Sequence, residues 1–147
     1  MDKKYEIEYG ITELVEDAYK FNYDVDFSKL DKKDLHFQFE HNITISSANE
    51  LLIVTLRVRL FNGATELVLQ SVRASFIIKP FNSFVNNIDG DDINVTSPKL
   101  IDTFISVCIG AVRGMLAKNL KGTPLNGVVL PLVPMTVIRQ NSVKGKK

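Results

Sequence analysis

The sequence predicts an α+β fold in which a run of antiparallel strands precedes one long helix and a C-terminal extended segment. Polar and apolar residues alternate over residues 35–46 and again over 51–60, which is the period of strands with one buried face. Asn62-Gly63 separates the second run from a third, and this dipeptide favours a tight hairpin. From Pro98 onward, apolar residues recur at helical spacing.

The N-terminal part of the chain is expected to add a further strand. Residues 5–27 are rich in the aromatic and β-branched residues that favour strands, and the charged residues 28–34 link them to the strand at Leu35. The third alternating run, residues 66–79, should pair antiparallel with the second. Because apolar residues occur on both of its faces, we expect both to be partly covered.

A loop is expected between the strands and the helix, over residues 80–97. Its acidic centre, Asp89-Gly90-Asp91-Asp92, is interpreted as a solvated turn, because it lacks the ligand order of a calcium-binding loop. Ser97 is the predicted N-cap of the helix, with Pro98 at its first position. An apolar strand is predicted after the helix, from Gly127 to Val137.

The long helix has two distinct stripes. The apolar stripe predicts that one face is buried and that Cys108 lies within it as a small hydrophobe. The other stripe carries Ser106, Gly110 and Gly114 at a spacing of four, and such small residues let a second backbone approach closely. We therefore predict an oligomer interface on this second stripe.

Composition indicates one soluble domain. The chain has 147 residues, of which 45% are hydrophobic, so we expect a single domain at residues 1–140 and a basic flexible tail at 141–147. Eighteen basic and seventeen acidic residues give a net charge of +1, which predicts no recruitment of nucleic acid or of an anionic membrane. No signal peptide and no run of about 18 consecutive apolar residues is present, so we expect no membrane insertion and a cytoplasmic location.

Catalytic and metal-binding patterns are missing from the sequence. The single cysteine excludes an internal disulfide and favours a reducing compartment. His36 and His41 fall on opposite faces of one strand, so they do not form a metal site. No nucleotide-binding loop or nucleophile motif is present. We therefore predict a protein that is not an enzyme and uses no cofactor.

Three arginines project from one face of the predicted sheet, namely Arg57, Arg59 and Arg73. Such a face could suit single-stranded RNA, but the aromatic signatures of RNA-binding sheets are missing. Ion pairs with Glu50 or Glu66 are the preferred interpretation.

One helix leaves apolar residues without an obvious cover. Large exposed apolar patches usually mark interaction sites. Unfolded clients could cover this surface, a small apolar ligand could bind in the concave side of the sheet, or subunit contacts in a structural assembly could bury it. The residues concerned are Phe76, Ile78, Phe81, Phe84, Val128, Val129, Leu130, Leu132 and Val133.

The end of the helix resembles the SecB-like export-chaperone superfamily. In SecB proteins an Arg-Gly-Thr-Phe-Pro type of loop ends the long helix and precedes a Leu-Asn-Leu-Ala-Pro-Val-Asn-Phe segment. Here Gly122-Thr123-Pro124 matches the loop, with lysine in place of arginine, and Leu130-Pro131 stands where Ala-Pro does. The order of the strands also compares well, so the resemblance covers roughly residues 11–135. The second helix of SecB proteins is not expected, because residues 136–147 are polar and few.

The resemblance implies a four-stranded antiparallel sheet with helices on one side, and association into dimers or tetramers. It also implies binding of unfolded or partly folded polypeptides without ATP, in protein export, with an antitoxin or in another pathway. Docking to the motor SecA is not expected, because the acidic character that SecB proteins use for it is absent at a net charge of +1. The predicted client-binding residues are Phe76, Ile78, Phe81, Phe84, Val85, Val129 and Leu132.

Overall fold

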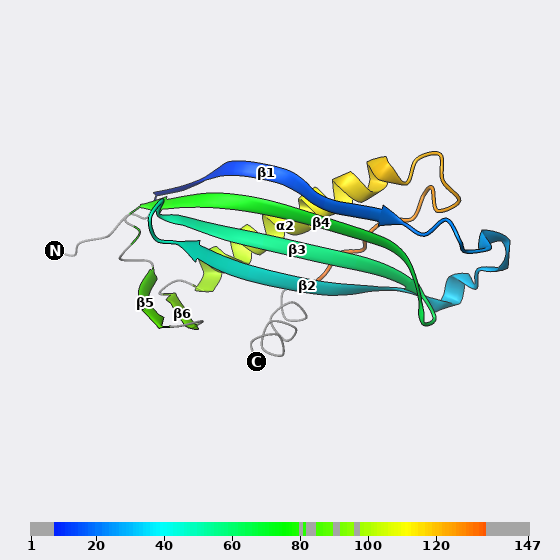
Figure 1. The fold of residues 1–147 in the computed structure, drawn as a ribbon, viewed down its shortest axis with the longest axis horizontal. Helices are drawn as coiled ribbons and strands as arrows, with labels where there is room; N and C mark the ends of the chain where they lie inside the picture. The colour runs from blue at the N-terminus through cyan, green and yellow to red at the C-terminus, as the bar shows by residue number, and fades with distance from the viewer. Residues whose placement is uncertain (1–7, 80, 82–84, 90–91, 96–97, 135–147) are drawn as a thin grey trace.

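Four long strands form one sheet, and a long helix crosses one of its faces (Figure 1). The computed structural model describes residues 8–79, 81, 85–89, 92–95 and 98–134, with the backbone alone for 85–89, 92–95 and 98–99. The strands of the sheet are β1 (Glu8–Phe21), β2 (Leu35–Ser46), β3 (Leu51–Asn62) and β4 (Thr65–Lys79), and the helix is α2 (Pro98–Asn119). Short 3₁₀ turns, η1 (Phe27–Lys29) and η2 (Lys32–Asp34), lie between β1 and β2.

The strand order is β1-β4-β3-β2, with every neighbouring pair antiparallel. The predicted pairing of the second and third alternating runs is confirmed, because β3 pairs with β4 through the Asn62-Gly63 turn, where Gly63 has a φ of +61°. β1 pairs with the other side of β4, so β1 and β2 are the two edges of the sheet. β1 is irregular at two places, between Ile11 and Glu13 and between Glu16 and Ala18.

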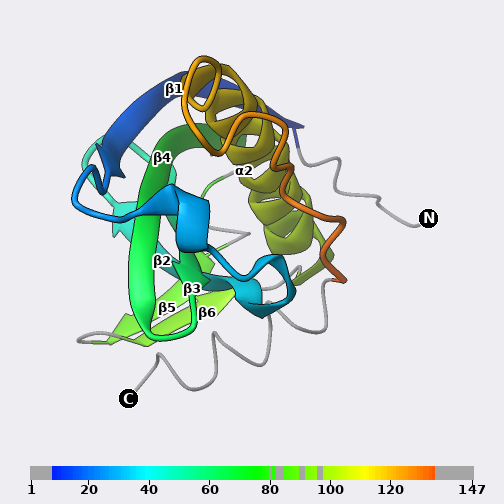
Figure 2. The same cartoon turned by 90° about the vertical axis from the view of Figure 1, so that its right-hand side faces the viewer.

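The core lies between the sheet and α2. Alternation places the apolar residues of β3 and β4 on one face, and the apolar stripe of α2 packs on that face, as seen end-on in Figure 2. A second cluster lies near the end of α2 around Leu60, Leu67 and Leu116. The members of the main cluster contributed by α2 include Leu100, Phe104, Ile105, Cys108, Ile109 and Val112.

Two predictions about the connecting segments are wrong. The loop expected over residues 80–97 contains a small hairpin, β5 (Val85–Asp89) paired with β6 (Asp92–Val95), which flanks the acidic turn. The strand expected from Gly127 onward does not form within the described residues, which end at Pro134. Pro131 and Pro134 lack the N–H group that a sheet ladder needs, so the segment stays extended and unpaired.

Candidate polypeptide-binding surface

α2 covers only the middle of the sheet, since it packs on β3 and β4 and leaves the two edge strands less covered. On β1, the side chains of Tyr9, Ile11 and Leu14 face the helix side but are 45% to 52% exposed. Tyr9 contacts Phe104 of α2 edge-on, with ring centroids 5.9 Å apart. We call these three residues the β1 row. The row lies beside an unpaired strand edge, an arrangement that can accept a further strand.

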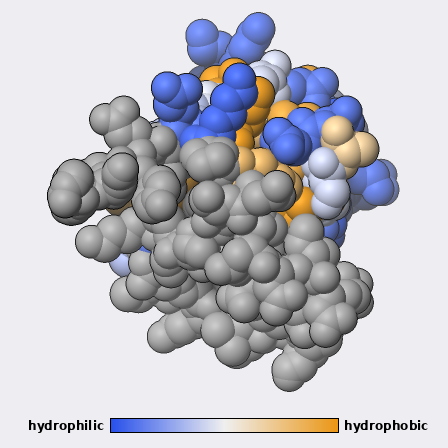
Figure 3. All heavy atoms as spheres, turned by 90° about the vertical axis from the view of Figure 1, so that its left-hand side faces the viewer, coloured by the Kyte–Doolittle hydropathy of each residue, from blue (hydrophilic) through white to orange (hydrophobic). Residues whose placement is uncertain are grey.

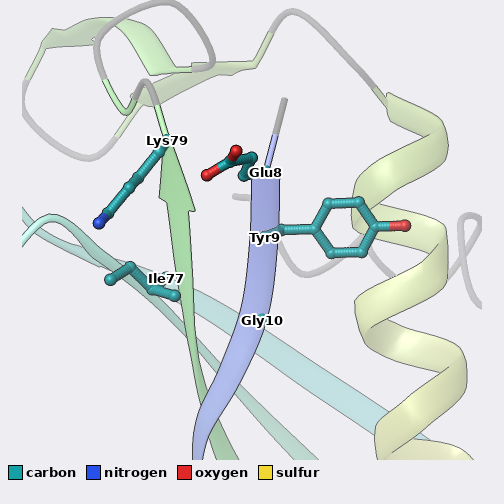
Figure 4. A pocket seen from close by; sticks show the side chains of 5 residues that line it. All are labelled: Glu8, Tyr9, Gly10, Ile77 and Lys79. Carbon is teal, nitrogen blue, oxygen red and sulfur yellow. The ribbon is translucent and has the colours of Figure 1, made fainter. Parts of the chain in front are cut away.

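The end of the molecule where β1 begins has apolar residues at its surface among hydrophilic ones (Figure 3). A hollow open to solvent lies here, lined by Glu8, Tyr9, Gly10, Ile77 and Lys79. Figure 4 shows Tyr9 directed toward α2, whereas Glu8, Ile77 and Lys79 project from the other side of the two strands. The β1 row therefore belongs to the helix side of the sheet and the hollow mostly to the opposite side.

The outer face of α2 carries the stripe of small residues predicted from the sequence. Ser106, Gly110 and Gly114 are exposed, and a Cβ added at either glycine would meet nothing within 4 Å. Val107 on the same face is 40% exposed. Within the part of the chain that the structure describes, no neighbour requires glycine at these positions, and their predicted role in an oligomer interface stays a prediction.

The loop after α2 ends the helix sharply. Gly122 has a φ of +78°, a conformation that favours glycine at this position after a helix. The Thr123 hydroxyl donates to the Leu120 carbonyl at 2.7 Å and accepts from the Leu125 N–H at 3.1 Å. Leu125 is buried in the second cluster. The Gly-Thr-Pro sequence thus fixes the direction in which the chain leaves the helix.

Residues 128–134, here called the strap, then run back along the side of α2 that is nearer β2, as both ribbon views show. Leu130 is 1% exposed and belongs to the main core cluster, whereas Val129 and Leu132 are 59% and 88% exposed. Arg113 of α2 donates from Nε to the Leu130 carbonyl at 2.9 Å and from Nη2 to the Pro131 carbonyl at 2.8 Å. The strap is thus held by one buried side chain and by two charge-assisted hydrogen bonds.

A polar network joins β1, β4 and the end of α2. Gln70 is fully buried, and its Nε2 donates to Glu16 Oε2 at 2.7 Å. Asn119 Nδ2 donates to the same Glu16 oxygen at 2.6 Å and to Gln70 Oε1 at 2.9 Å. Tyr19 donates to the Asn119 carbonyl, and burial raises the pKa of Tyr19, with Tyr23 and Glu16 acting in the same direction. Since its members satisfy one another, the network fixes α2 on the edge strand.

The face of the sheet opposite α2 carries the predicted arginines in ion pairs. Arg59 contacts Glu40 at 2.8 Å and Glu66 at 3.3 Å, so the pairing expected with Glu66 is present. The hydrogen bond from Arg59 holds the pKa of Glu40 below its usual value. Arg73 lies 3.4 Å from Asp17 and 3.9 Å from Glu13. Paired charges of this kind favour a solvated sheet face over a site for nucleic acid.

The structure corrects the expected exposure of several predicted client-binding residues. Phe76, Ile78 and Phe81 are buried, at 2%, 0% and 6% exposure, because alternation along β4 directs the first two to the face that α2 covers. Leu130, also expected to lack cover, is buried as well. Val128 and Val133 are partly buried against the core clusters. The expectation that these side chains lie uncovered is therefore wrong.

The remaining predicted client-binding residues lie in different parts of the chain. Val85 is the first residue of β5, and Phe84 lies outside the described residues. Val129 and Leu132 are exposed on the strap. Among the members whose exposure the structure describes, those of β4 and Phe81 are buried and the two of the strap are exposed.

Cys108 lies in the core, and the two histidines lie on opposite faces of β2. Burial raises the pKa of the Cys108 thiol to about 12, which suits the predicted role as a small hydrophobe. His36 is exposed and stacks on Phe61, while His41 faces the other side of β2. In the part of the chain that the structure describes, no three histidine, cysteine, aspartate or glutamate side chains gather as a metal ion requires.

α2 has one property that counting consecutive apolar residues did not predict. By length and composition alone, its residues Leu100–Asn119 could cross a membrane. Core helices of soluble proteins share this property, and α2 packs its apolar stripe on β3 and β4.

Comparison of the structure with solved structures identifies the fold. The SecB-like chaperone Rv1957 of Mycobacterium tuberculosis, solved in complex with a ChAD peptide from the HigA1 antitoxin, superposes with a TM-score of 0.55. The match covers 86% of this chain and 88% of that chain, at 12% sequence identity. No family model matches this sequence, and no curated protein matches it. The SecB-like α+β fold predicted from the sequence is confirmed, and this chain is a divergent example of it.

Sequence reasoning missed the residues that distinguish the two flanks of α2. The β1 row was not singled out, because β1 alternates irregularly and two bulges shift its apolar residues out of period. Arg113 was also missed, although it is the only charged residue between Thr103 and Ala117. A lone arginine in an otherwise uncharged helix stretch was the signal that could have revealed it.

Proposed function

We propose that this chain is a non-enzymatic, SecB-like polypeptide-binding protein that shields apolar segments of unfolded clients. The observation that carries the proposal is the incomplete cover of the sheet, which leaves apolar side chains exposed on both sides of α2, at the β1 row and at the strap. Burial of apolar surface drives such binding without nucleotide or metal. The structural neighbour, bound to a peptide, has the same fold.

We assign client contact to the exposed residues of the strap. Val129 and Leu132 point to solvent beside an apolar bed that includes Phe37, Phe39 and Met115. Extended polypeptides bind such surfaces through alternate side chains and main-chain hydrogen bonds. We therefore give the region of Phe81 and Val85 a smaller part in client binding than the sequence indicated, because Phe81 is buried in the core.

We assign self-association to the other flank, where the β1 row meets the outer face of α2. Ser106, Val107 and Gly110 are themselves uncharged, so a second copy can pack on them without burying an ion of theirs. The free edge of β1 would then pair, and Tyr9, Ile11 and Leu14 would be covered. A homo-oligomer of this kind leaves the strap accessible for clients.

We place this protein in the cytoplasm, where a single buried cysteine stays reduced. Export is one pathway that a SecB-like chaperone could serve, and binding of an antitoxin is another, since the structural neighbour was solved in complex with an antitoxin peptide. Clients from either pathway would offer the same extended apolar segments. The apolar surface therefore indicates the chemical class of the client, an extended apolar segment, and not which protein the client is.

The proposed function is tested by suppression of aggregation. A reduced, unfolding client protein is followed by light scattering with this protein at stoichiometric amounts. We expect suppression by the wild type and a clear loss in the double variant Val129→Ser, Leu132→Ser, whose side chains are exposed and so contribute little to folding. Tyr23→Ser is the matched control, because Tyr23 is 80% exposed and is not part of the strap. No suppression by the wild type would leave only the fold in common with SecB proteins.

A further inference from the structure

The strap has unusual contacts for a segment that lies on the core. Among the described residues it forms no sheet ladder, although it is extended, and its first main-chain bond is that of the Val128 N–H to the Leu125 carbonyl in the preceding turn. Val128, Leu130 and Val133 face inward, whereas Val129, Pro131 and Leu132 are exposed. The strap therefore lies on the protein in the manner of a bound extended peptide.

The contacts that hold the strap do not depend on most of its sequence. Within the described part of the chain, Arg113 donates to the main-chain carbonyls of Leu130 and Pro131, and any residue offers a carbonyl at the same place. The guanidinium fork spans two consecutive residues, so it fixes the direction and position of an extended chain. The inward side chains need only be apolar and of moderate size, because the bed is made of aromatic and aliphatic side chains.

The bed beneath the strap joins both core clusters. Val128 packs on the second cluster and Leu130 on the main one, while Phe37 of β2 belongs to both. The core-facing aromatic residues of β2 are only partly buried. Displacement of the strap would thus expose a continuous apolar strip along α2 and β2, with Arg113 at its centre.

We propose that the strap occupies, within the same chain, the site that takes an extended apolar segment of a client, and that Arg113 binds the client's main-chain carbonyls. The inference rests on the proposed function and states how the client is recognised. A client segment first contacts Val129 and Leu132 on the outside of the strap and then exchanges with the strap, so affinity reflects the fraction of molecules in which the strap has left its bed. Proline within the client is tolerated, because the site uses carbonyls and not N–H groups.

The test uses a peptide with the sequence of residues 126–134, Asn-Gly-Val-Val-Leu-Pro-Leu-Val-Pro, carrying fluorescein at its N-terminus. Amide hydrogen exchange of the wild-type protein is measured with and without this probe. We expect saturating probe to speed exchange of the Val128 N–H, whose bond to the Leu125 carbonyl holds the start of the strap, and to leave β4 unchanged. Slower or unchanged exchange in the strap while the probe is bound would overturn the proposal.

Variants separate the role of the strap from that of Arg113. Leu130→Ala weakens the strap but leaves the bed, so the probe should bind about tenfold more tightly, since more molecules have an open site. Arg113→Met keeps the apolar stem and removes the hydrogen bonds to the carbonyls. The gain in probe affinity should therefore be absent in Arg113→Met and in the double variant Leu130→Ala, Arg113→Met. Lys118→Met, which removes an exposed cation from the same helix, is the control and should bind the probe as the wild type does. Circular dichroism verifies that each variant is folded.

Failure of this inference differs from failure of the proposed function. If the wild type suppresses client aggregation but Leu130→Ala binds the probe no better, the exchange with the strap is wrong and the chaperone activity stands. If the wild type neither suppresses aggregation nor binds the probe, the proposed function is wrong and this inference falls with it. A probe with aspartate in place of its central leucine should not bind, because the apolar bed offers no partner for a carboxylate.

Discussion

Gln70 occupies a position on the core face of β4 where its neighbours Val68, Val72 and Ala74 are all apolar. A buried amide is tolerated only when its hydrogen bonds are made, and here Glu16 and Asn119 make them. The alternation of β4 shows that residue 70 points inward, so its burial could be predicted. Its partners could not, because they lie 54 and 49 residues away in the chain and depend on the pairing of β1 and the placement of α2.

Cys108 supports a prediction about stability at alkaline pH. Burial raises its pKa from 9.0 to about 12, so between these values the unfolded chain loses a proton that the folded chain keeps. The contribution of this thiol is full below pH 9 and is lost as pH rises toward 12. The free energy of unfolding should fall by about 1.4 kcal/mol per pH unit above pH 9 through this group.

Urea unfolding of the wild type and of Cys108→Ala between pH 8 and pH 10 measures this effect. The variant is less stable overall, because a buried side chain is shortened, but its stability should decline less steeply with pH. Parallel declines in the two proteins would show that other groups, such as the tyrosines, cause the loss. The comparison of slopes makes the outcome independent of the cost of truncation.

At the scale of elements, Gly110 connects helix stability to assembly. A Cβ at this position meets nothing within 4 Å in the single chain, and glycine inside a helix costs about 0.5–1 kcal/mol relative to alanine. Gly110→Ala should therefore raise the free energy of unfolding of the isolated chain by that amount, measured by urea unfolding at low protein concentration. Gly110→Leu should in addition block association if a second backbone approaches here. Equal mass distributions for wild type and Gly110→Leu would place the interface elsewhere.

The strands and the helix could be predicted closely, whereas the segments between them could not. Residues 35–46 form β2 as the alternation predicted, and the third run is β4 with one further residue at its start. These elements have long periodic patterns that local sequence determines. The hairpin of β5 and β6 and the unpaired strap lack such patterns. Proline at 131 and 134 was the available signal against a strand after Gly127.

At the scale of the whole molecule, the position of β1 decides which surface is open. The order β1-β4-β3-β2 puts the N-terminal strand beside the fourth one, a long-range pairing that no local pattern reveals. The candidate site could be predicted only in part for the same reason. Leu132 and Val129 were identified from excess apolar content, while the burial of Phe76 and the exposure of Ile11 follow from how α2 lies on the sheet.

The proposed assembly is tested by its mass in solution. We expect a wild-type mass that is a multiple of 16.5 kDa by light scattering, and a fall toward 16.5 kDa for Ile11→Asp, because the carboxylate would be buried without a partner at the β1 row. Tyr23→Asp is the control, since it adds the same charge at an exposed aromatic residue outside the row. A wild-type mass of 16.5 kDa would contradict the assembly directly.

The two bulges of β1 have a further consequence for a protein that keeps apolar surface open. A flat, regular edge can template the addition of one chain after another, which is how fibrils grow. The breaks after Ile11 and Glu16 twist this edge and interrupt its ladder, so a flat stack of identical strands does not match it. In the assembly proposed above, a second copy that pairs in the antiparallel direction would close the edge instead of extending it. The strand that exposes apolar side chains thus also limits the addition of further strands at its edge.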